Sequence, residues 1–321
     1  MATSADLRND PRPELTATAR VAHAGSDWQA SYAGFNAASA LGPLDADDLA
    51  AMAAAAWRLG RLAESVRLSE RVFTQYARRD PVAAGDKAVG LALAWLTRGD
   101  RNIGRTWMQR ARELIGGAPA TPTHGYLLYL EVVQAADAPA PDLDDRVRAL
   151  GALGEELQSP AVTALALVAG ARAALAGGRT ERAHELLDAA ERLARTGGLP
   201  IEWAGEVYGT VLRHSRRDVD VDRSAEWVDA MERWREQAGL AGVYRGWAAH
   251  SRGAVQVRTG EHRRALDSLA VALREYRTLQ PSRDTADVYE WMMMAHRSLG
   301  DGAAAEDDAA SASAILRLLA E

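Results

Sequence analysis

Small and apolar residues recur at fixed spacings along the chain and predict paired helices. Five glycines are each followed, five residues later, by a small side chain: Gly60 by Ser65, Gly99 by Gly104, Gly178 by Ala183, Gly260 by Ala265 and Gly300 by Ala305. Further small or apolar residues follow at offsets of four and then three, which places them on one helical face. A second helix-length run precedes each glycine, which predicts a hairpin closed by a left-handed glycine cap.

The repeat unit predicts the fold class. Its small-residue position falls at residues 31, 65, 104, 183, 224, 265 and 305, and the long step from 104 to 183 hides one degenerate repeat. A single hairpin cannot bury its apolar face, so neighbouring hairpins stack. We therefore expect an all-α protein, an α-solenoid of about eight helix-turn-helix repeats forming a right-handed superhelix.

The domain organisation follows from the same pattern. Residues 14–321 are expected to form one solenoid domain, and the polar residues 1–13 a disordered N-terminal tail. Segments rich in Pro, Gly and Ala at residues 116–122 and 136–142 predict linkers around the degenerate fourth repeat. Pro160, Pro200 and Pro281 stand where helices are expected to begin.

The repeats resemble a known family. Trp28, Ser31, Phe35, Ala38 and Pro43 have the spacing of a tetratricopeptide repeat. Segments 25–38, 100–114, 224–239 and 247–273 resemble the tetratricopeptide-like helical-repeat regions of actinobacterial LuxR-type and MalT-like transcriptional regulators. The resemblance covers nearly the whole chain, but the last residues continue the helical pairs where such regulators usually carry a DNA-reading helix-turn-helix. It therefore implies the sensory or interaction half of a bacterial regulator.

Composition narrows the class of function. Hydrophobic residues form 48% of the chain, yet Phe occurs only twice, so the predicted core consists of small side chains on closely packed helices. The absence of cysteine excludes disulfides, a thiolate nucleophile and sulfur-ligated zinc. A net charge of −6 disfavours direct nucleic-acid binding. No signal-peptide or membrane-spanning pattern occurs, so a cytoplasmic location without membrane attachment is expected.

Motifs for catalysis and cofactors are scarce. The chain has one lysine, Lys87, and no Walker phosphate loop, and its histidines are scattered one to an element. His250 and Glu290 form the one cross-repeat pair that could serve acid–base catalysis, and most such pairs are ordinary polar contacts. We therefore predict a non-catalytic protein with no cofactor and no metal site.

One charged segment needs a separate interpretation. The cations of residues 213–217 end a predicted helix, a position that favours positive charge, and three aspartates at 218, 220 and 222 follow them. With Asp229, these aspartates resemble a calcium loop, but Arg223 occupies the place of its glycine. We expect the aspartates to offset the preceding cations and to cap the next helix.

Aromatic and arginine residues mark a candidate binding surface. The first helix of each pair is expected to line the concave face of the solenoid. Counting back from the turn glycines predicts these inward residues: Trp57, Arg58, Arg172, Trp247, His250, Arg258, Glu290 and Arg297, with Tyr129 and Arg213 if the irregular repeats keep phase. Trp28, Trp107, Trp227 and Trp234 belong to second helices and are expected in the core.

A groove rich in tryptophan and arginine suits partner recognition. The expected function is a regulatory or scaffold module that binds a protein or peptide segment in bacterial transcriptional regulation or signalling. The alternative is a small-molecule sensor or enzyme with a closed pocket around Trp247, His250 and Arg213. A third possibility is a homo-oligomeric scaffold that stacks through the apolar last helix at residues 314–320.

Overall fold

The computed structural model describes residues 10–135, 142–196 and 198–320, which form helices and no strands. The helices form eight consecutive pairs: α1 (Arg12–Ala24) and α2 (Trp28–Leu41), α3 (Ala46–Arg58) and α4 (Leu62–Tyr76), α5 (Pro81–Thr97) and α6 (Arg101–Ile115), α7 (Pro122–Ala135) and α8 (Leu143–Glu156), α9 (Pro160–Ala176) and α10 (Thr180–Arg195), α11 (Ile201–Ser215) and α12 (Val221–Gln237), α13 (Val243–Arg258) and α14 (His262–Tyr276), α15 (Arg283–Ser298) and α16 (Gly302–Leu318).

The predicted α-solenoid is confirmed; the hand of its superhelix stays a prediction. All five turn glycines adopt the positive φ angles of a left-handed cap, between +70° and +91°. The small side chains that follow them are buried, and Ala183 and Ala265 have no exposed surface. Helix α1 begins at Arg12, two residues before the predicted start of the domain. Most of the predicted tail, residues 1–9, and most of the second linker, residues 136–141, lie outside the described residues.

Small residues are needed because paired helices nearly touch. A β-carbon added to Gly104 on α6 would lie 2.6 Å from a methyl carbon of Leu96 on α5. A β-carbon on Gly253 of α13 would lie 2.6 Å from Leu269 Cγ on α14. Packing at this range gains many dispersion contacts and leaves no room for larger side chains.

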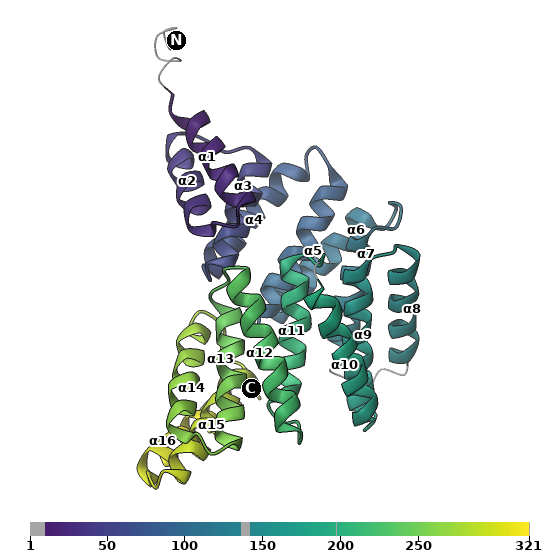
Figure 1. The fold of residues 1–321 in the computed structure, drawn as a ribbon. Coiled ribbons are helices and arrows are strands. Elements are labelled where there is room, and N and C mark those ends of the chain that lie inside the picture. Colours follow the sequence, from purple (N-terminus) through teal and green to yellow (C-terminus); the bar gives the residue numbers. More distant parts are fainter. Residues whose placement is uncertain (1–9, 136–141, 197, 321) are drawn as a thin grey trace.

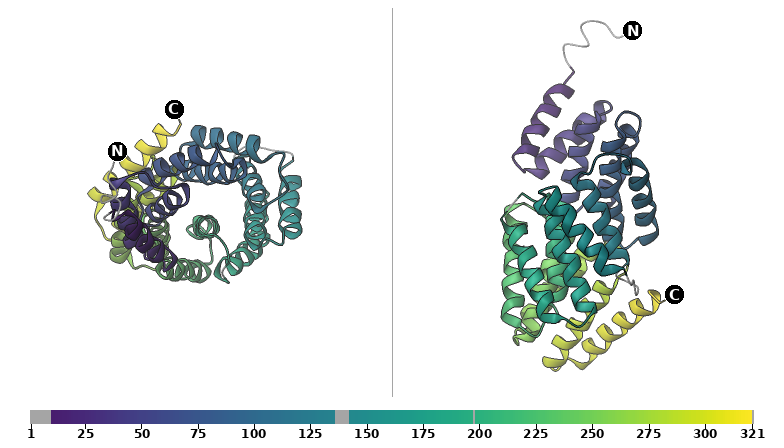
Figure 2. Two further views of the ribbon diagram at one scale, coloured as in Figure 1. Left: turned by 90° about the horizontal axis from the view of Figure 1, so that it is seen from above. Right: turned by 90° about the vertical axis from the view of Figure 1, so that its right-hand side faces the viewer.

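Seen along its axis, the solenoid forms a ring (Figure 2, left), and in the side views its first pairs lie above its last ones (Figure 1; Figure 2, right). The loop before α13 meets the turn after α3, where the Ala241 amide donates to the Arg58 carbonyl over 2.9 Å. The loop before α15 meets the turn after α5, where the Gln280 amide donates to the Arg98 carbonyl over 3.0 Å. Closure therefore joins the backbones of repeats that are far apart in the sequence.

Helix α11 lies inside the ring, where Figure 2 (left) shows a helix seen end-on. It reaches α7 through its side chains: the Trp203 ring stacks on Tyr126, with ring centroids 4.3 Å apart. One turn later, Glu206 accepts a hydrogen bond of 2.8 Å from the Tyr129 hydroxyl. The first helix of the sixth pair therefore crosses the space that a regular solenoid would leave as a groove.

Candidate functional site

Two cavities lie against α11. The aromatic cavity has a volume of about 260 Å³ and is lined by α3, α4, α5, α7 and α11, including Trp57, Lys87, Tyr126, Glu202 and Trp203. The arginine cavity has a volume of about 270 Å³ and is lined from α5 round to α15. Its polar wall residues include Arg98, Arg101, Gln134, Arg172, Glu206, Arg213, Tyr276, Gln280, Ser282 and Asp284, and its apolar wall includes Leu93, Leu96, Leu130, Val133, Trp247 and Leu279.

Arg213 is held in place at the wall of the arginine cavity. Its Nη2 donates to Thr210 Oγ1 over 2.9 Å and lies 3.6 Å from Glu206 Oε1. The guanidinium also stands over the Trp247 ring, 5.8 Å from its centroid, which is within cation–π range. About a third of the Arg213 side chain stays exposed, so its remaining donors can reach an occupant of the cavity.

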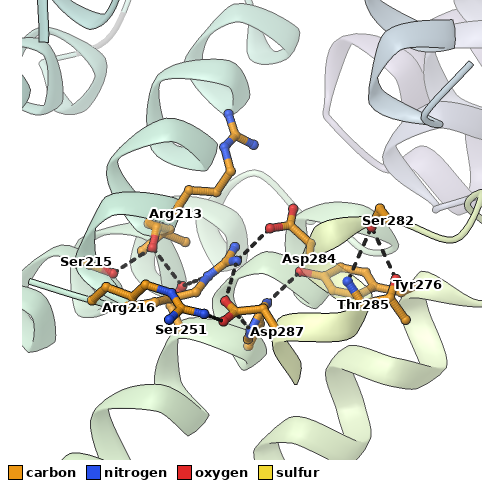
Figure 3. Close-up of polar contacts among 12 residues, drawn as sticks. Arg213, Ser215, Arg216, Ser251, Tyr276, Ser282, Asp284, Thr285 and Asp287 are labelled. Carbon is orange, nitrogen blue, oxygen red and sulfur yellow. Dashed lines mark hydrogen bonds and ion pairs between the residues drawn. The ribbon is translucent and has the colours of Figure 1, made fainter. Parts of the chain in front are cut away.

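A buried ion-pair network lies behind this wall (Figure 3). Arg216, which is 2% exposed, donates from Nη1 to Asp284 over 2.7 Å and to Asp287 over 3.4 Å. Its Nε donates to Ser251 Oγ over 3.2 Å. Burial alone would raise the pKa of Asp284, but the charges of Arg216 and Arg213 outweigh burial and lower this pKa to about 2. Arg216 therefore keeps this carboxylate ionised inside the ring.

His250 belongs to the same network and does not line the arginine cavity. Its Nε2 lies 3.3 Å from Asp287 Oδ2, and its Nδ1 lies 3.3 Å from the Tyr276 hydroxyl. The predicted pair of His250 with Glu290 is wrong, because Glu290 instead accepts a hydrogen bond from Arg217. His250 is fully buried by protein, so it has no access to a substrate.

The environment of His250 predicts a pH-dependent stability. Burial and the Arg216 charge lower its pKa to about 4, against the opposing effect of Asp287. A histidine in an unfolded chain titrates near ~6.5, so below that pH the unfolded state binds more protons than the folded state. The free energy of unfolding should therefore fall by on the order of 3 kcal/mol as the pH falls from about 6.5 to 4. Urea unfolding at several pH values measures the loss.

The matched comparison is between His250→Gln and His262→Gln, which changes a histidine outside this network. His250→Gln should flatten the dependence of the free energy of unfolding on pH, and His262→Gln should leave it as in the wild type. Equal pH dependence in all three chains would show that His250 titrates normally in the folded state.

The aromatic cavity contains the chain's single lysine. Burial lowers the pKa of Lys87, while the nearby Asp86 and Glu202 carboxylates oppose this shift. Trp57 borders the cavity and donates from Nε1 to the Tyr244 hydroxyl over 2.8 Å. Arg58, next to it, forms a 3.3 Å ion pair with Glu202 and stands over the Trp28 ring. Trp57 and Arg58 therefore take part in closing the ring.

Four of the ten predicted inward residues line a cavity: Trp57 the aromatic cavity, and Arg172, Arg213 and Trp247 the arginine cavity. Tyr129 is buried behind the wall beside Glu206. Three residues predicted to point inward line neither cavity, so these predictions are wrong. Arg258 donates to the Ser215 carbonyl, Glu290 pairs with Arg217, and Arg297 is exposed. For Arg258 and Glu290 the physical reason is that the end of α11 and the loop after it pack against these side chains.

The sequence did not indicate several wall residues, among them Trp203, Glu206 and Asp284. The sixth pair lacks a turn glycine, so counting back from such a glycine cannot show which face of α11 points inward. The expected pairing of residues 213–217 with the following aspartates is also wrong for Arg216 and Arg217, whose partners are on α15. The four tryptophans assigned to second helices are confirmed there, and Trp28, Trp107 and Trp227 are buried.

One group of side chains in the described residues has the geometry to hold a metal ion. His184, His214 and Asp218 meet outside both cavities, at the C-terminal end of α11. Asp220, two residues later, accepts a hydrogen bond from the Arg223 amide and caps α12, as predicted for this acidic turn.

No protein-family model matches the chain, and no curated protein matches its sequence. Among the described helices, none combines the length and apolarity needed to cross a lipid bilayer.

Proposed function

We propose that this protein is a ligand-responsive regulatory module that binds a small organic anion in the arginine cavity. The observation that carries this proposal is the charge of the wall: four arginines and two carboxylates line the space. One of those carboxylates, Asp284, already pairs with the buried Arg216. Arginine recognises carboxylates and phosphates through paired hydrogen bonds. The leucines and Trp247 favour an occupant with an apolar body.

The geometry favours a small ligand over a peptide. A peptide in the concave face would need a continuous groove, and α11 crosses that space. A space of about 270 Å³, walled mainly by charged and polar side chains with apolar ones among them, has room for a small molecule but not for a peptide segment. The resemblance of the repeats to the sensory part of transcriptional regulators fits the same proposal.

Binding in this cavity would act on ring closure. Arg98 and Gln280 both line the cavity, and they also form the backbone contact between α5 and the loop before α15. An occupant that touches both sides stabilises the closed ring relative to an open one, and so alters the outer surface that a partner contacts. The ligand and a protein partner would then be coupled through one conformational equilibrium.

The test is a thermal-shift and calorimetric screen of aliphatic and aromatic carboxylates and phosphate monoesters, beside neutral amides and alcohols of the same shape. Anions should bind saturably and slow hydrogen exchange at the Gln280 amide. Arg213→Gln should weaken the best anion by about tenfold or more, because it removes a charge-assisted hydrogen bond. Arg264→Gln, at an exposed arginine on α14, should leave the affinity unchanged.

Two results would refute the proposal. One is a panel in which neutral molecules bind as well as anions, or in which nothing binds. The other is an anion whose affinity falls equally in Arg213→Gln and Arg264→Gln, which would indicate binding to general surface charge.

A further inference from the structure

Three metal-ligating side chains meet where α10 packs against the loop that follows α11. His184 comes from α10, His214 from the last turn of α11, and Asp218 from the loop. The Nε2 atoms of the two histidines lie 3.0 Å apart. Asp218 Oδ2 lies 3.1 Å from the His184 Nε2 and 3.9 Å from the His214 Nε2. The three atoms therefore form a small triangle.

The size of this triangle fits a transition-metal ion. Zinc binds imidazole nitrogen and carboxylate oxygen at about 2.0–2.2 Å, so tetrahedral ligands on one ion lie roughly 3.4 Å apart. The observed edges of 3.0, 3.1 and 3.9 Å lie on both sides of that length. Three such ligands leave the fourth position for water or another donor.

Asp218 gives an independent indication of a missing partner. Its side chain is 1% exposed, and its Oδ2 accepts no hydrogen bond among the described residues, because the neighbouring His184 Nε2 bonds to His214 Nε2 instead. Its Oδ1 accepts a 3.2 Å hydrogen bond from the Asp220 amide, which turns Oδ2 toward the histidines. A buried carboxylate oxygen without a partner is costly, and a cation supplies that partner.

We propose that His184, His214 and Asp218 bind a divalent transition-metal ion of the zinc type. Two imidazoles and one carboxylate form a common ligand set for zinc. The Trp227 ring lies beside both imidazoles, with centroid distances of 6.3 and 6.1 Å, and shields the ion from bulk water. The ion ties α10 to the loop between α11 and α12, independently of the arginine cavity.

Arg223 competes with the metal. Its Nη1 lies 2.5 Å from His184 Nδ1 and donates a hydrogen bond to it, which leaves the ring proton on Nε2. Metal binding at Nε2 moves that proton to Nδ1, so Arg223 has to turn away. The Asp220 carboxylate, 3.7 Å from Arg223 Nη2, is a ready alternative partner. Removal of Arg223 should therefore tighten metal binding.

The test is calorimetric titration of the full chain, stripped with a chelator, with Zn²⁺, and with Co²⁺ as a spectroscopic probe. We expect one Zn²⁺ per chain, a rise in melting temperature, and visible absorption of four-coordinate Co²⁺ in the wild type. Asp218→Asn and His214→Ala should each weaken Zn²⁺ by at least about tenfold. Arg223→Met should bind it severalfold more tightly.

Matched controls are Asp222→Asn, at an exposed acid in the first turn of α12, and His262→Ala on α14. Both should bind Zn²⁺ like the wild type. The proposal is overturned if the wild type binds less than half an equivalent, if its Co²⁺ spectrum is that of the aquo ion, or if Asp218→Asn binds as Asp222→Asn does. The spectrum decides the matter even where a ligand variant fails to fold.

Discussion

Replacing Arg216 with methionine should lower the free energy of unfolding by about 3–5 kcal/mol. Methionine fills a similar volume but leaves Asp284 and Asp287 without their buried cation. The side chains of Asp284 and Asp287 are only 28% and 13% exposed, and an uncompensated buried charge costs more than the ion pair itself contributes. Urea unfolding, followed by far-UV circular dichroism, measures the change.

Arg217→Met is the matched control. Arg217 also contacts Asp287, but 66% of its side chain is exposed, so its loss should cost less than about 1 kcal/mol. Adding Asp284→Asn to Arg216→Met should recover part of the stability, because it removes one orphaned charge. If the two single variants lose the same stability, Arg216 is no better shielded from water than Arg217 in solution, and the network is not buried.

The sequence predicted well those features that depend on neighbours along the chain. A left-handed turn requires glycine, so Gly178 and Gly260 mark the ends of first helices directly. Close helix packing requires a small residue at one fixed offset, so Ala183 and Ala265 could be placed in the core. The repeat also sets the phase of α9 and α13, which is why Arg172 and Trp247 were assigned inward.

Contacts between distant repeats could not be predicted in this way. The Trp57 and Tyr244 side chains meet only because the whole ring closes. The curvature of the solenoid is not determined by the sequence near either residue. His250 was paired with Glu290, whereas its partner is Asp287, three residues earlier. Residues three apart share one helical face, so repeat alignment alone cannot choose between them.

Closure of the ring itself should be sensitive to one methyl group. A β-carbon on Gly60 would lie 2.7 Å from the Gly242 α-carbon, and both glycines have positive φ. Gly60→Ala should therefore combine backbone strain with a clash between two backbones that cannot give way. We expect it to cost about 1–3 kcal/mol more than strain alone. It should also speed hydrogen exchange at the Ala241 amide, which closes the ring at this point.

Gly260→Ala isolates the strain, because Gly260 is the same turn glycine in the seventh pair. Its φ is +84°, against +77° for Gly60, and an added β-carbon there meets no atom within 4 Å. This variant should lose only the roughly 1–2 kcal/mol of a left-handed alanine and keep the Ala241 amide protected. Equal losses in the two variants, with equal protection of that amide, would mean that the turns after α3 and α12 are apart in solution. The ring would then be open, and the arginine cavity would lose the wall formed by α13 and α15.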